Sequence, residues 1–137
     1  MTYYHQLSVR FADTDANGHV FFANYLTFFD QAFVHYLKAI GFGYRQFVQR
    51  GLNFFYAEAL TRFKSGAVFD QLLDIYPAIS RLARTSFTTE FEIYDHASGA
   101  FVNSGYIVSV VVDMKTEKPH PIPEAFRQAV SAFHTQG

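Results

Sequence analysis

Two carboxylates, an Asn-Gly pair and a histidine stand close together in the run FADTDANGHVFFANYLTFFDQ, from Phe11 to Gln31. The run leads directly into an aromatic-rich segment with helical spacing. Backbone N–H groups in the first turn of a helix lack partners inside the helix and carry partial positive charge. A carboxylate at Asp15 could therefore attack a carbonyl, or activate water to do so, while those N–H groups hold the developing oxyanion.

The same residues also have an ordinary structural interpretation. Asp and Asn before a helix are common capping residues. Asn17-Gly18 is a common turn pair, and Gly18 would let the backbone pass close to a ligand. Spacing alone does not decide between a cap and a catalytic carboxylate.

The elements that must position this run follow from the periodicity of the apolar residues. Alternation predicts a strand from His5 to Ala12, followed by a turn from Asp13 to Gly18. From Ala23 to Ile40 apolar residues recur every three or four positions, which predicts a helix with one broad buried face. Gly41 is suited to end that helix.

The rest of the chain predicts one short helix at Tyr44–Arg50, four strands and a final amphipathic helix that begins near Pro123. The four strands are expected at 53–64, 68–80, 85–94 and 100–113, with hairpin connections at Ser65–Ala67 and Asp95–Gly99. This order indicates a single α+β domain over residues 1–137, in which a long helix lies on a curved antiparallel sheet of about five strands. Such a sheet has an exposed edge, which pairing with a second copy would cover.

Composition narrows the possible functions. The chain has 137 residues, of which 50% are hydrophobic, including 17 Phe and 9 Tyr, so some apolar surface is expected to meet a ligand or a partner subunit. A net charge of -1 gives no global field for nucleic acid or anionic lipid. The absence of cysteine suits a reducing cytoplasm. We also expect no membrane insertion and, because the histidines lack ligand spacing, no metal.

The run VRFADTDANGHVFFANYLTFFDQA closely resembles the N-terminal signature of the hotdog-fold acyl-CoA thioesterases of the 4-hydroxybenzoyl-CoA thioesterase family. Its matching features are an aromatic residue, Asp-Thr-Asp, a glycine three positions later, a short apolar stretch and Asn24-Tyr25 at the helix start. Weaker similarity continues through Phe69-Asp70, the run from Arg84 to Phe87, and Pro121-Ile122-Pro123. The resemblance therefore covers nearly the whole chain and implies the hotdog fold.

The resemblance also implies roles for particular residues. Asp15 would be the catalytic carboxylate, acting as nucleophile or general base, and the backbone amide of Phe22 would form the oxyanion hole. Other residues would bind or surround the substrate, with the basic ones taking the coenzyme A phosphates: Gly18, His19, Asn24, Tyr25, Arg62, Lys64, Arg81, Arg84 and Thr85. For Asn24 and Tyr25 the ordinary alternatives are capping and core packing, and any of the basic residues could be a solvated surface group. Thr85 departs from the family pattern, because a relative has a base there.

The expected function is therefore hydrolysis of an acyl-CoA thioester to a free acid and coenzyme A, in a dimer or tetramer and without a separate cofactor. Two alternatives remain. One is a hotdog-fold enoyl-CoA hydratase or dehydratase; its Asp and His are five residues apart in the motif, whereas Asp15 and His19 are four apart. The other is a non-catalytic acyl-CoA-binding module.

Overall fold

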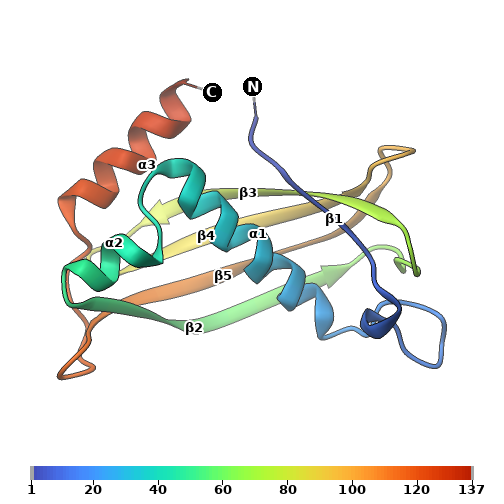
Figure 1. The fold of residues 1–137 in the computed structure, drawn as a ribbon, viewed down its shortest axis with the longest axis horizontal. Coiled ribbons are helices and arrows are strands. Elements are labelled where there is room, and N and C mark those ends of the chain that lie inside the picture. The colour runs from blue at the N-terminus through green and yellow to red at the C-terminus, as the bar shows by residue number, and fades with distance from the viewer. Residues whose placement is uncertain (1, 137) are drawn as a thin grey trace.

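The computed structural model describes residues 2–136. Within this range, five strands form one curled antiparallel sheet in the order β1-β3-β4-β5-β2 (Figure 1). Their bounds are β1 His5–Ser8, β2 Leu52–Phe63, β3 Leu72–Leu82, β4 Ser86–Asp95 and β5 Phe101–Asp113. The helices are α1 Asn24–Ile40, α2 Tyr44–Gln49 and α3 Glu124–Gln136. The predicted α+β arrangement is confirmed.

The long helix α1 lies across one face of the sheet (Figure 1). Its apolar stripe is buried there, with Phe29, Phe33 and Tyr36 almost fully enclosed. The ring of Phe29 stacks on Phe91 of β4, with 4.7 Å between centroids. The helix ends where Gly41 takes a φ of 89°, a left-handed conformation that favours glycine. The prediction of a central helix with one buried face is confirmed.

The first strand is shorter than predicted. It ends at Ser8 instead of Ala12, and residues Phe11–Asp13 form a single 3-10 turn. The buried carboxylate of Asp13 causes this turn, because it accepts hydrogen bonds from the backbone N–H of Arg10 at 2.8 Å and from the Arg10 guanidinium at 2.8 Å. A local side-chain bond thus replaces the strand pairing that the alternation suggested.

The strand predicted from Val68 begins only at Leu72. Before it, the chain turns, with Asp70 at a φ of 70° and the side chain of Gln71 accepting a hydrogen bond from the Val68 N–H at 3.0 Å.

The hairpin predicted at Ser65–Ala67 is wrong. β2 is an edge strand beside β5, whereas β3 lies between β1 and β4, so the segment between β2 and β3 crosses from one side of the sheet to the other. Ala67 within this crossover bonds to the region before and within α1: its carbonyl accepts the N–H of Val20 at 2.8 Å and its N–H donates to Tyr25 Oη at 3.1 Å. These bonds take the place of hairpin pairing. The connection predicted at Asp95–Gly99 does join the neighbouring strands β4 and β5.

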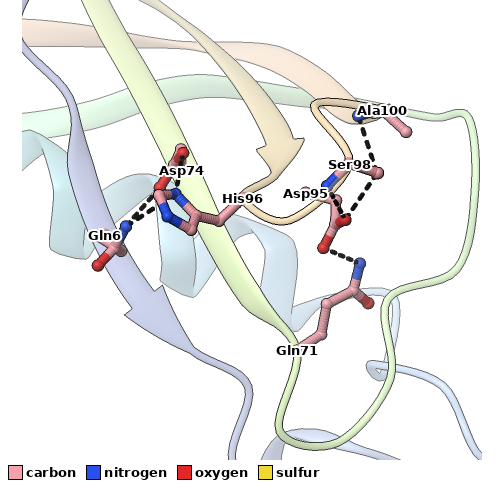
Figure 2. Close-up of polar contacts among 7 residues, drawn as sticks. All are labelled: Gln6, Gln71, Asp74, Asp95, His96, Ser98 and Ala100. Atoms are coloured by element: carbon pink, nitrogen blue, oxygen red, sulfur yellow. Dashed lines mark hydrogen bonds and ion pairs between the residues drawn. The ribbon is translucent and has the colours of Figure 1, made fainter.

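A polar cluster on the other face of the sheet ties the short strand β1 to its neighbours (Figure 2). Gln6 of β1 donates to Asp74 of β3 at 2.9 Å, and the second oxygen of Asp74 lies 2.8 Å from Nδ1 of His96. His96 follows directly after β4, in the turn that leads to β5. The cluster therefore links three parts of the sheet at the β1 side.

Candidate active site

The loop between Asp13 and α1 is a tight turn that closes on itself. Thr14 and Val20 form an isolated antiparallel bridge, and the N–H of Asp15 donates to the carbonyl of His19 at 2.9 Å. Gly18 sits at the tip with a φ of 82°, so glycine is needed there for its left-handed backbone. We call residues 14–20 the Asp15 loop.

The carboxylate of Asp15 is half-buried and only partly used by the protein. One oxygen accepts the N–H of Asn17 at 2.9 Å, which is the local bond expected of an Asp in a turn. Across residues 2–136, no side chain or backbone group bonds to the other oxygen. Asp15 thus supports its loop while one oxygen remains available.

Asp13 differs from Asp15 in its surroundings. Burial alone would raise the pKa of Asp13, but the hydrogen bonds and the positive charge of Arg10 outweigh it and lower this pKa. Both oxygens of Asp13 are bonded to Arg10. Asp13 is therefore a structural ion-pair partner, whereas Asp15 has one oxygen without a protein partner in the described range.

The start of α1 is anchored to Asp13 through its backbone. The carbonyl of Asp13 accepts the N–H of Phe21 at 2.8 Å and the side-chain amide of Asn24 at 2.9 Å. In the described chain, the N–H of Phe22 has no hydrogen-bond acceptor. Asn24 therefore fastens the helix to the loop, and the unpaired Phe22 amide stands at the positive end of the helix.

A pocket of about 250 Å³ is lined in part by Phe22, the residue that carries this amide. Its lining brings together three residues that the sequence singled out, Phe22, Tyr25 and Lys64; the remaining lining residues are Val20, Phe63, Ser65 and Gly66. Tyr25 is buried and its hydroxyl is bonded to Ala67, so it forms part of the pocket wall. Asp15 is not among the lining residues, although Val20 at the end of its loop is.

His19 of the same loop lies against the crossover. Its exposed imidazole packs on the backbone of Gly66, which has no side chain to displace it. Sequence reasoning missed Ser65 and Gly66 because it placed them in a hairpin. No local signal indicates that this segment crosses the sheet.

The other predicted binding residues lie elsewhere in the chain. Arg62 of β2 pairs with Ser104 of β5. The two neighbours of Ser104, Asn103 and Gly105, are buried, and successive side chains of a strand point to opposite faces, so Arg62 faces away from α1. Arg81, Arg84 and Thr85 lie at or next to the turn between β3 and β4. The first residue of β4 after this turn pairs with Val110 of β5. Phe63, which lines the pocket, pairs with Asn103 of β5. Seven positions along β5 separate these levels (103 to 110), or roughly 20 Å at about 3.3 Å per residue. A single chain therefore does not bring these residues to Asp15.

A larger pocket, of about 510 Å³, lies next to Asp74 and His96, on the side of the sheet away from α1. None of the residues predicted for the site lines it, and it offers no amide at a helix start, so size alone does not make it the reactive centre. In residues 2–136 no group of three or more His, Asp and Glu side chains could hold a metal ion. Nor does that range contain a helix with the length and apolar character needed to cross a membrane.

Comparison with known proteins places this chain in a family. Residues 9–130 match the thioesterase-like superfamily. The 1,4-dihydroxy-2-naphthoyl-CoA hydrolase of Thermosynechococcus vestitus is 30% identical over 125 residues, which cover 88% of this chain and 82% of that protein. The acyl-CoA thioester hydrolase YbgC of Escherichia coli is 26% identical over 117 residues, covering 85% of this chain and 87% of that protein.

A solved structure of a gentisyl-coenzyme A thioesterase superposes with a TM-score of 0.84 at 30% identity, covering 93% of this chain and 99% of the other. The curled sheet with its long helix is thus the hotdog fold of these enzymes. The chain is a hotdog-fold thioesterase and belongs to the thioesterase-like superfamily.

Proposed function

We propose that this protein hydrolyses acyl-CoA thioesters, with Asp15 as the catalytic carboxylate and the Phe22 amide as the oxyanion hole. The observation that carries the proposal is that Phe22, whose N–H has no acceptor within the described residues, lines a pocket together with Val20 at the end of the loop that bears Asp15. The named relatives act on CoA thioesters, which supports the same substrate class here.

The chemistry needs little activation. Sulfur donates less resonance to a carbonyl than oxygen or nitrogen does, so a thioester carbon is already electrophilic. As the tetrahedral intermediate forms, negative charge grows on the carbonyl oxygen, and the Phe22 N–H with the α1 dipole would stabilise it. Losing one oxyanion donor typically lowers the rate by about a hundred- to a thousandfold.

Two routes are compatible with Asp15. As a general base, its free oxygen takes a proton from water, the hydroxide adds to the carbonyl carbon, and collapse of the intermediate expels the coenzyme A thiolate, which accepts the proton. As a nucleophile, the carboxylate adds directly, expels the thiolate and forms an anhydride that water then cleaves. Both routes release one thiol and one acid for each water consumed.

Binding of coenzyme A would use Lys64 at the pocket and basic residues from a second copy. If two β2 edges pair about a two-fold axis, the Leu52 end of one strand meets the Phe63 end of the other. That pairing carries the β3–β4 turn of one copy, with Arg81 and Arg84, toward the pocket of the other. The roughly 20 Å separation within one chain is then bridged by the partner.

The test is a free-thiol assay over short, long and aromatic acyl-CoAs, with wild type and Asp15→Asn. Asn keeps the turn-forming acceptor for the Asn17 N–H but removes the charge, so we expect thiol release to fall by about 10² to 10⁴-fold. The matched control is Asp113→Asn. Asp113 also accepts the N–H two residues ahead, at 2.8 Å from Lys115, but lies at the end of β5 outside the pocket, so its substitution should leave the rate unchanged.

Each alternative gives a different pattern in the same assay. A hydratase would consume 2-enoyl-CoA without releasing thiol. A binding module would hold acyl-CoA without turnover in wild type. Full thiol release by Asp15→Asn would remove Asp15 from the mechanism.

A further inference from the structure

Gly66 in the crossover between β2 and β3 is constrained by space and not by backbone conformation. Its φ is not in the left-handed region. A Cβ at this position would lie 2.8 Å from Cδ2 and 3.0 Å from Cγ of His19. To restore an ordinary contact of 3.4 Å, the His19 ring would have to move by about 0.6 Å. A glycine at position 66 thus lets the imidazole lie directly on the crossover.

The His19 contact is connected to Asp15 through the backbone. The carbonyl of His19 accepts the N–H of Asp15 at 2.9 Å across the Asp15 loop. The next residue, Val20, donates its N–H to Ala67 at 2.8 Å, immediately beside Gly66. The loop therefore rests on the crossover at two adjacent points, a ring contact and a hydrogen bond. A displacement of the His19 backbone would be passed to Asp15, because the hydrogen bond between them closes the turn.

We propose that Gly66 and His19 are positioning residues for the reaction: the missing side chain at 66 sets how closely the Asp15 loop seats on the crossover, and so where the Asp15 carboxylate stands relative to the Phe22 amide. The inference rests on the proposed function. It assigns the His19 ring to packing, which differs from the proton-transfer role that a hydratase would give it. Since catalysis depends on near-ideal placement of reacting groups, a shift of about 1 Å can cost about a hundredfold in rate.

The experiment compares Gly66→Ala, His19→Ala and the double variant by thiol release, with kcat and KM determined separately on one acyl-CoA. We expect Gly66→Ala to lower kcat by up to about a hundredfold while KM changes by less than about threefold, because the loop moves and the pocket wall gains only one methyl group. His19→Ala alone should lower kcat less, since the Val20–Ala67 bond still seats the loop. In the double variant the clash is gone, so kcat should return to the His19→Ala level.

The control is Gly43→Ala. A Cβ at Gly43 would meet its nearest neighbour at 3.7 Å, an ordinary contact, so this glycine-to-alanine change should leave kcat and KM as in wild type. Thermal unfolding of every variant separates misplacement from loss of fold. If Gly66→Ala alone does not fold, the comparison of the double variant with His19→Ala remains decisive, because the proposal requires equal kcat values.

Wild-type kcat in Gly66→Ala, or a double variant slower than His19→Ala, would overturn the inference. Asp15→Asn keeps this outcome distinct from failure of the proposed function. Loss of activity in Asp15→Asn with normal activity in Gly66→Ala rejects only the positioning role. Normal activity in Asp15→Asn rejects the function on which the role depends.

Discussion

Asp13 and Asp15 are separated by one residue, yet their carboxylates meet different surroundings. Asp13 is buried and paired with Arg10, whereas Asp15 keeps one oxygen free of protein partners within residues 2–136. The two Asp residues of the Asp-Thr-Asp run therefore differ in role. The carboxylate of the first Asp shapes the turn, and the backbone carbonyl of the same residue anchors α1 through Asn24. The second is the carboxylate that we propose as catalytic.

A second residue-scale feature predicts a dependence of stability on pH. The rings of His5 on β1 and His35 on α1 stack at 4.5 Å between centroids, with their planes 12° apart. Burial, and secondly the charge of His35, lower the pKa of His5 below its ordinary value of 6.5. The unfolded chain therefore binds this proton more readily than the folded one, so the free energy of unfolding should fall as pH drops through 6.5 toward the folded pKa.

Urea unfolding at about pH 7.5 and about pH 5.5 checks this prediction. The loss of stability between the two values should be smaller in His5→Gln than in wild type. His120→Gln, which changes an exposed histidine beyond β5, serves as the control and should show the wild-type loss. An equal loss in His5→Gln and wild type would contradict the assignment.

At the scale of elements, contact between α1 and the sheet depends on Gly105 of β5. A Cβ there would lie 2.0 Å from the Leu60 carbonyl oxygen and 2.7 Å from the ring of Phe29. The carbonyl belongs to the neighbouring strand β2 and cannot yield without breaking the pairing. Gly105 thus allows β2 and α1 to approach the same point of β5.

Gly105→Ala should lower the free energy of unfolding by about 3 kcal/mol, the upper part of the usual range for overpacking. Chemical denaturation measures this difference, with Gly43→Ala as a control expected to stay within about 0.5 kcal/mol of wild type. A Gly105→Ala protein as stable as that control would show that β5 accommodates the methyl group.

The sequence predicted elements whose determinants are local. The central helix was readable because its apolar periodicity and the glycine at its end lie within one segment. Asp15 and the Phe22 amide were paired as candidates through the family resemblance, whose signature is a short local run in which only six residues lie between them. The crossover could not be predicted from the sequence, because β2 pairs with β5, about 40 residues away, and not with β3, which follows it in the sequence. The contact between Gly66 and His19 could not be predicted for the same reason.

At the scale of the whole molecule, the two edges of the sheet are unequal. β1 has 4 residues and β2 has 12. β2 also exposes large apolar side chains: Phe55 is 49% exposed, Tyr56 47% and Phe63 55%. A long, apolar edge strand is a template for pairing, so we expect β2 to join a second copy.

Ala57→Lys tests this pairing. Ala57 is exposed near the centre of β2, so a two-fold axis there would bring two added charges together and weaken the dimer. Light scattering after size-exclusion chromatography should show the dimer mass for wild type and a monomer for Ala57→Lys. Ser8→Lys, on the opposite edge, should keep the wild-type mass. An unchanged mass in Ala57→Lys would place the interface elsewhere.

The inequality of the edges also determines where assembly stops. A filament can grow only if both edges of the sheet can pair, because each added copy must present a free edge to the next copy. Here the opposite edge is the four-residue strand β1, and the residues that follow it form a 3-10 turn. This edge therefore offers an incoming strand few residues for pairing. Growth would therefore terminate after one addition, and this aromatic-rich chain would be protected from fibre formation by its own geometry.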